Sequence, residues 1–107
     1  MTAHATGCQV TEFVSKLNSR TRNRLFAIIK KTADEGKYEE EEIYRQIGEG
    51  IWEFKAQTAR VYSFNEGTRR IVLTHAGYKP HKNMVKVERD KALVIQHQYD
   101  EWKRTAS

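Results

Sequence analysis

Cationic and imidazole side chains recur along one short stretch, residues 51–82, and their types suit chemistry on a phosphate group. The stretch reads IWEFKAQTARVYSFNEGTRRIVLTHAGYKPHK and has the composition of three consecutive β-strands. The side chains in question are Lys55, Arg60, His75, Lys79, His81 and Lys82. A sheet that keeps such groups near one surface can bind a polyanion and stabilise charge on a phosphate. RNA is therefore the leading candidate substrate.

Strand periodicity predicts which of these groups lie together, because successive side chains of a strand face opposite sides of the sheet. One face of the first strand would carry Ile51, Glu53 and Lys55, and the other Trp52, Phe54 and Ala56. One face of the next strand would carry Arg60, Tyr62 and Phe64. The pattern thus predicts that Lys55 and Arg60 come from neighbouring strands of one sheet.

The composition indicates one compact domain with a modest core, since the chain has 107 residues of which 38% are hydrophobic. No apolar run approaches the roughly 20 residues of a transmembrane helix, and the N-terminus lacks the features of a secretory signal. Cys8 is the only cysteine, which excludes an internal disulfide and suits a reducing compartment. We expect a cytoplasmic protein without membrane association, in which Cys8 is a bystander.

The net charge of +5 is concentrated in the second half of the chain. Residues 68–107 carry nine Lys and Arg against four Asp and Glu, whereas basic and acidic residues balance in the remainder. Such an asymmetry favours an acidic partner, either a nucleic acid or an acidic protein segment.

Apolar spacing predicts two helices at the N-terminal end. An i, i+3, i+4, i+7 pattern begins at Val10 and ends at Leu17, with a short strand over 8–14 as the alternative. Asn18 or Ser19 would cap a second helix that Gly36 ends. Residues 1–9 would form a loose arm before this helical hairpin. The acidic run 39–42 would begin a further helical turn that includes Ile43, Tyr44 and Ile47 and is broken at Gly48 and Gly50.

The remaining elements give the fold class. Asn65–Gly67 predicts a hairpin, because Gly67 can supply the positive φ of a short loop. Residues 84–104 predict a basic helix whose apolar stripe comprises Val85, Ala92, Ile95, Tyr99 and Trp102. The sequence therefore predicts an α+β fold: an N-terminal helical hairpin, an antiparallel sheet of three to four strands and a C-terminal helix.

Three segments of the sheet carry a recognisable combination of motifs: GIWEFK at 50–55, ARVYSF at 59–64 and IVLTHAGYK at 71–79. The spacing E-x-x-x-A-L follows from Glu88 to Leu93. The combination resembles the RelE/ParE toxin superfamily, in particular its HigB-like, phage Gp49-like branch, over about residues 10–104. Two departures stand out. Lys55 replaces a common Arg, and Lys79-Pro80-His81-Lys82 is a shortened form of the usual K-K-T-x-K-T-P loop.

The resemblance implies a toxin of a type II toxin–antitoxin pair. HigB-like and RelE-like members cleave mRNA, usually in the ribosomal A site, without a metal or other cofactor. The implied partners are the ribosome, mRNA and a cognate antitoxin, expected to be a helix-turn-helix DNA-binding protein. ParE-like members inhibit DNA gyrase instead, so a gyrase inhibitor is one alternative and a non-catalytic RNA-binding member is another.

Metal-free cleavage through the ribose 2′-hydroxyl requires a base, an acid and cations for the charge on phosphorus. Arg60 is the candidate phosphate ligand because its planar guanidinium can bind two oxygens, and Lys55 is the second cation. His75 is the candidate general acid or base because imidazole titrates near neutral pH, and Glu53 is a competing base. The simpler interpretations are a surface arginine, a solvated lysine, a hydrogen-bonded structural histidine and an ion pair between Glu53 and Lys55.

Other side chains could bind the RNA itself. Tyr62 or Tyr78 could stack on a base, although for Tyr62 packing in the core is the favoured interpretation. The backbone path would be lined by Lys79, His81, Lys82 and Lys86, which are otherwise ordinary loop residues. The pairs His4 with Cys8 and His75 with His81 are too sparse to predict a zinc site, so no metal is expected.

Overall fold

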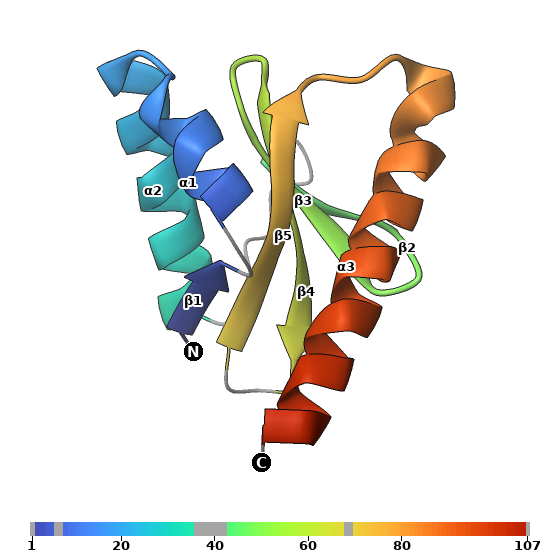
Figure 1. Cartoon of the computed structure of the whole chain (residues 1–107). Coiled ribbons are helices and arrows are strands. Elements are labelled where there is room, and N and C mark those ends of the chain that lie inside the picture. The colour runs from blue at the N-terminus through green and yellow to red at the C-terminus, as the bar shows by residue number, and fades with distance from the viewer. Residues whose placement is uncertain (1, 6–7, 36–42, 68–69, 107) are drawn as a thin grey trace.

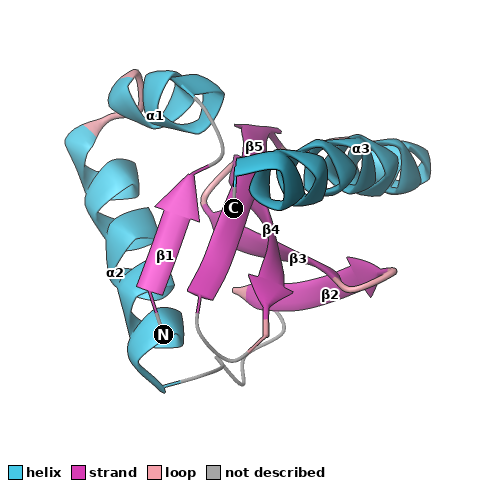
Figure 2. Cartoon of the chain, turned by 60° about the horizontal axis from the view of Figure 1, so that its bottom comes forward, coloured by secondary structure: helices cyan, strands magenta, loops and turns pink. Residues whose placement is uncertain are grey.

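The computed structural model describes residues 2–5, 8–35, 43–67 and 70–106. A five-stranded sheet in the order β1-β5-β4-β3-β2 separates two layers of helices (Figures 1 and 2). The strands are β1 (Thr2–Ala5), β2 (Tyr44–Gly48), β3 (Ile51–Ala56), β4 (Ala59–Glu66) and β5 (Arg70–Tyr78). The helices are α1 (Cys8–Ser15), α2 (Ser19–Glu35), the 3₁₀ turn η1 (Lys82–Met84) and α3 (Val85–Ala106). The α+β class, the antiparallel sheet β2–β5 and the C-terminal helix are confirmed.

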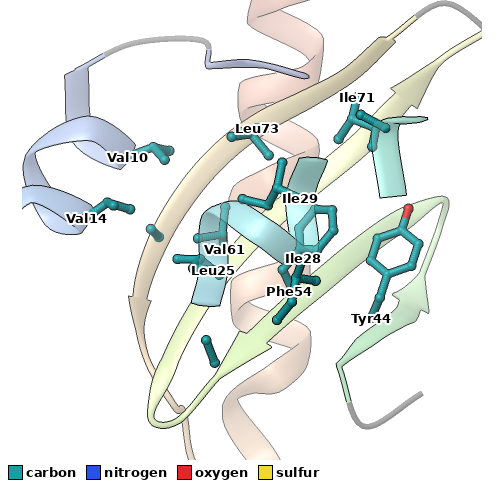
Figure 3. Packing of buried hydrophobic residues seen from close by; sticks show 13 residues of the cluster. Val10, Val14, Leu25, Ile28, Ile29, Tyr44, Phe54, Val61, Ile71 and Leu73 are labelled. Carbon is teal, nitrogen blue, oxygen red and sulfur yellow. The ribbon is translucent and has the colours of Figure 1, made fainter. Parts of the chain in front are cut away.

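The N-terminal helical hairpin is also confirmed, and the alternative of a strand over 8–14 is wrong. Asn18 caps α2, because its Oδ1 accepts a hydrogen bond of 2.9 Å from the backbone N–H of Thr21. Figure 3 shows Leu25 and Ile28 of α2 lying against Phe54 and Val61 of the sheet. The two helices therefore cover one sheet face with an apolar core, as the i, i+3, i+4 spacing requires. The predicted stop at Gly36 lies outside the described residues.

The predicted loose arm over residues 1–9 is wrong where the chain is described. Thr2–Ala5 form β1, which pairs in parallel with Arg70–Leu73 of β5. The Gln9 side chain then continues the pairing. Its Nε2 donates to the Ala76 carbonyl and its Oε1 accepts from the Ala76 N–H, both at 2.8 Å. An amide side chain carries the same donor and acceptor as a peptide group, so it can occupy the edge of a strand.

The predicted helical turn through residues 43–47 is also wrong. Tyr44–Gly48 form the edge strand β2, paired antiparallel with β3. Tyr44 is buried and stacks on Trp52 and Phe54, with ring centroids 4.6 Å apart in each case. Cross-strand pairing and aromatic packing outweigh the local preference for a helix. The acidic run 39–42 lies outside the described residues.

The β4–β5 ladder contains a bulge that decides where His75 points. Tyr62 pairs with His75 but Ser63 pairs with Leu73, so Thr74 is the extra residue. The hydroxyl of Thr74 lies 3.2 Å from the Tyr62 carbonyl, to which it can donate. Without the bulge, strand alternation would place Val72 and His75 on opposite faces. With it, both face α3.

The α3 helix lies across the second face of the sheet (Figure 2). Ala92 and Tyr99 are buried against Ile51, Phe64 and Val72, whereas Trp102 is 61% exposed. The apolar stripe that the sequence predicts thus packs over most of its length but not at its C-terminal end. None of the described helices is long and apolar enough to cross a membrane.

The Asn18 cap generates a stability prediction. Asn18→Ala removes the acceptor for the Thr21 N–H and should lower the free energy of unfolding by about 1 kcal/mol. Urea denaturation measures this change. Asn23→Ala, at an exposed position inside the same helix, is the matched control and should cost nothing, because alanine is the better helix former. Equal losses in the two variants would contradict the capping role.

Candidate active site

The α3 face of the sheet carries three rows of side chains that run across the strands. Lys55, Arg60 and Gly77 pair in one row, which we call the cation row. The next row, the polar row, contains Arg45, Glu53, Tyr62 and His75. The third contains Ile51, Phe64 and Val72, which pack against α3. Apolar packing therefore fixes α3 beside the two rows that carry chemistry.

The Glu53 side chain is buried within the polar row. Its side chain is 1% exposed, and its Oε1 accepts a hydrogen bond of 3.1 Å from Nε of Arg45. The ion pair expected with Lys55 is therefore made with Arg45, the residue opposite Glu53 on β2. A carboxylate in this position is neutralised and shielded, so it is unsuited to the role of a base that contacts substrate.

Tyr62 lies between Glu53 and His75 and belongs to the core. Its ring stacks on the His75 imidazole with centroids 4.5 Å apart and an interplanar angle of 18°. Its hydroxyl is buried on the side of the Glu53 carboxylate. Burial raises the pKa of Tyr62, and the nearby carboxylates of Glu53 and Glu88 raise it further. One ring face is already covered by His75, which favours the core role over stacking on an RNA base.

His75 is held at both ring nitrogens. Nε2 lies 2.9 Å from Oε2 of Glu88 on α3, and Nδ1 lies 3.2 Å from the Thr74 hydroxyl. Glu88 Oε1 in turn accepts from Nζ of Lys91 at 3.3 Å. Burial lowers the pKa of His75 and Lys91 lowers it further, although Glu88 opposes both effects. The imidazole is therefore neutral around pH 7, with a carboxylate beside it.

The sequence reasoning missed the role of Glu88, although a signal was present. Glu88 falls within the apolar stripe of α3, between Val85 and Ala92, at the spacing that faces the sheet. A carboxylate among core-facing positions of a helix requires a buried partner, and that partner is His75. Arg45 was missed because its strand was interpreted as a helix.

Arg60 is buried, whereas we expected an exposed strand cation. It is 7% exposed, and its Nη1 donates to the carbonyls of Gln57 and Ala59, both at 2.8 Å. Those carbonyls belong to the β3–β4 turn, where Gln57 has a φ of +55°. Arg60 thus stabilises the turn as well as contributing positive charge to the surface.

Lys55 lies at the centre of a cluster of like charges. Burial lowers its pKa, and Arg45, Arg60 and Lys79 lower it further, with Glu53 opposing. Four cations close enough to influence one another repel unless an anion lies between them. The cluster therefore favours a phosphate group as its ligand, and the lowered pKa of Lys55 makes it easier for this ammonium to release a proton.

A groove of about 650 Å³ opens between β5 and α3, beside the cation row. Its lining includes His75, Glu88, Lys91, Val94, Gln98 and the 65%-exposed Tyr78. Gly77 belongs both to the groove and to the cation row, and a side chain there would meet no atom within 4 Å. The groove therefore borders the cation row at Gly77.

The other predicted RNA-binding residues lie beyond this groove. His81, Lys82 and Lys86 are exposed on the β5–α3 connection and the first turn of α3. Among the described residues, no three His, Cys, Asp or Glu side chains are grouped as a metal site requires. The side chains of His4 and Cys8 are not among those that the structure describes.

Comparison with known protein families gives one match. The sequence model of the phage-derived protein Gp49-like family (DUF891) matches residues 12–97. The chain belongs to the Gp49-like family. No curated protein matches the chain. The Gp49-like family is a toxin-like, RelE-type group, and the match spans both the cation row and the polar row together with Glu88.

The environment of His75 predicts how the stability of this Gp49-like protein depends on pH. Burial holds the folded-state pKa of His75 below 6.5, the ordinary pKa of a histidine side chain. The neutral imidazole therefore stabilises the fold above about pH 6.5, and this contribution is lost as the pH falls through 6.5 towards the folded-state pKa. We expect the free energy of unfolding to fall between pH 7.5 and 5.5 more steeply in the native protein than in His75→Gln.

Urea denaturation at several pH values across this range measures the slope. His97→Gln is the matched control, because that side chain is 76% exposed on the same molecule. The prediction fails if His75→Gln and the native protein lose stability in parallel.

Proposed function

We propose that this Gp49-like protein is a HigB-like toxin of a type II toxin–antitoxin pair. It would act as a metal-independent endoribonuclease that cleaves mRNA on the ribosome and so inhibits translation. The observation that carries the proposal is that a histidine–carboxylate pair lines an open groove, and that Gly77 of the same groove pairs with Arg60 of the cation row. This combination supplies both the binding of a phosphate and the movement of protons next to it.

The cleavage uses the ribose 2′-hydroxyl of the RNA as nucleophile. The His75–Glu88 pair accepts its proton, and O2′ then forms a bond to the adjacent phosphorus. Lys55 and Arg60 stabilise the additional charge on the phosphate. The bond from phosphorus to O5′ breaks, and O5′ takes a proton from Lys55, whose lowered pKa suits a general acid. The products are a 2′,3′-cyclic phosphate and a free 5′-hydroxyl.

The positions of the proposed base and acid on different strands support this displacement. The nucleophile and the leaving oxygen lie on opposite sides of phosphorus, so one group must serve each side. His75 is on β5 and Lys55 on β3, with Arg60 of β4 between them. Neighbouring strands lie about 4.8 Å apart, so two long side chains can reach one phosphate from its two sides.

The surroundings of the groove suit the proposed ligand and partners. Tyr78 presents an exposed ring for stacking on a base, and the Phe13 ring approaches it edge-on with centroids 5.0 Å apart. Lys79, His81, Lys82 and Lys86 would follow the RNA backbone towards the ribosome. The antitoxin would place an acidic segment over this basic half of the chain, in competition with RNA.

Induced expression tests the proposal in cells. We expect growth to stop and new mRNA 5′ ends to map at in-frame positions of translated messages. Plasmid supercoiling is measured in the same cultures. Altered supercoiling with intact messages would reject the nuclease and support a gyrase inhibitor, and growth without either change would support a non-catalytic member.

The role of Lys55 as acid gives a second prediction. Lys55→Arg keeps the positive charge, but guanidinium does not release a proton near neutral pH. We expect the rate of mRNA cleavage to fall about a hundredfold while RNA binding is retained. Lys103→Arg is the control, since Lys103 pairs with Glu66 away from the groove. An undiminished rate in Lys55→Arg would mean that Lys55 acts through charge alone.

A further inference from the structure

We infer that Glu88 is the catalytic residue that takes the proton from the ribose 2′-hydroxyl, and that His75 is a positioning residue that holds the carboxylate in place. The inference rests on the proposed nuclease function and assigns roles within its histidine–carboxylate pair. Both ring nitrogens of His75 already have hydrogen-bond partners, whereas the Glu88 carboxylate lines the groove and keeps a second oxygen for substrate.

His75 has no ring nitrogen left for a substrate. Nδ1 faces the hydroxyl of Thr74, which is 3% exposed, and Nε2 faces Glu88. One face of the ring lies on Tyr62. Thr74 is the bulged residue of β5, so the backbone itself brings its hydroxyl to Nδ1. His75 is thereby fixed from three sides, as the orienting member of a catalytic pair should be.

The proton between the two groups belongs to the imidazole. An ionised carboxylate only accepts hydrogen bonds, so Nε2 carries the hydrogen and donates it to Oε2 of Glu88. Nδ1 then carries no hydrogen, and the single hydrogen of the Thr74 hydroxyl can be donated either to it or to the Tyr62 carbonyl. An imidazole in this state cannot take a proton at Nε2, which leaves the carboxylate as the base.

Glu88 has the exposure that the alternative carboxylate lacks. Its side chain is 21% exposed and lines the groove, whereas Glu53 is 1% exposed and paired with Arg45. Its second oxygen, Oε1, is contacted by Lys91, a flexible side chain that is itself 58% exposed. A 2′-hydroxyl that displaces the Lys91 ammonium would meet a carboxylate oxygen already aligned by His75.

The step is balanced with the groups present. The 2′-hydroxyl proton passes to Oε1 of Glu88 as the O2′–phosphorus bond forms. The phosphorus–O5′ bond breaks, and Lys55 protonates the leaving O5′. Water then takes the proton from Glu88 and another proton returns to Lys55, so the reaction needs no oxidant, reductant or further reactant.

Two amide substitutions separate the roles in a cleavage assay with ribosomes and a defined mRNA. Glu88→Gln removes the base and should lower the cleavage rate by about a hundredfold to ten-thousandfold. His75→Gln supplies an amide N–H that can still donate to Glu88, so it should stay within about tenfold of the native rate. Glu101→Gln is the matched control, because Glu101 is an exposed residue of α3 that pairs with His97, and its rate should be unchanged.

The pH dependence of the cleavage rate is a second measurement, and it would not change if Glu88 and His75 had only a structural role. The titratable and charged groups facing Glu88 are His75 of β5, Tyr62 of β4 and Lys91 of α3. If Glu88 is the base, the acid limb of the rate profile persists in His75→Gln, since the base itself is still present. Thr74→Ser should match the native profile, and Thr74→Val should lower the rate, because only the former keeps the hydroxyl at Nδ1.

The outcomes distinguish this inference from the proposed function. Near-native cleavage by Glu88→Gln would overturn the inference and make His75 the base. Loss of the acid limb of the rate profile in His75→Gln would do the same. The latter measurement stands even if Glu88→Gln does not fold. A folded native protein that cleaves no mRNA would overturn the proposed function itself, and the inference with it.

Discussion

The pairing of β4 with β5 is the interaction on which the rest of the structure depends. These strands form the centre of the sheet, and the single additional residue in their ladder, Thr74, decides which side chains reach α3. Because of that residue, Val72 and His75 face the same way, one into the apolar contact with α3 and the other into the polar row. A regular ladder would retain the core but turn the imidazole towards α1 and α2, away from Glu88. The apolar packing and the chemistry are thus set by one backbone irregularity.

Charge is arranged on this surface at the expense of stability. Burial and the neighbouring cations lower the pKa of Lys55, and the same repulsion opposes folding when no anion is bound. The structure limits the effect locally. Arg60 is neutralised in part by two carbonyl oxygens of its own turn, and Arg45 by Glu53. Replacing Lys55 by a neutral residue can therefore stabilise the fold while removing part of the phosphate site, a trade-off common at functional surfaces.

The sequence supports the fold further than it supports the site. Helix periodicity at Val10–Leu17, the Asn18 cap and strand alternation at 51–56 are local signals, and each is borne out because tertiary structure agrees with it. The strand at Tyr44–Gly48 could not be found in this way, because its stability comes from β3 and from stacking on Trp52 and Phe54. The bulge at Thr74 has no signature in residue types. Glu88 could have been found from its core-facing position, but its partner could not, since that depends on the bulge.

The Gln9 side chain has a consequence for how the molecule behaves among other copies of itself. An open strand edge offers unpaired N–H and C=O groups to any extended chain that approaches, which is a common route to aggregation. β1 closes the edge of β5 along residues 70–73, and the Gln9 amide closes it again at Ala76, directly after His75. A side chain from a helix cannot propagate a sheet, because it presents no further peptide groups outward. At Ala76 the edge of β5 is therefore occupied by a side chain on which a strand of another molecule cannot continue the sheet. The protein can keep an accessible polar surface beside the groove without pairing to such strands there.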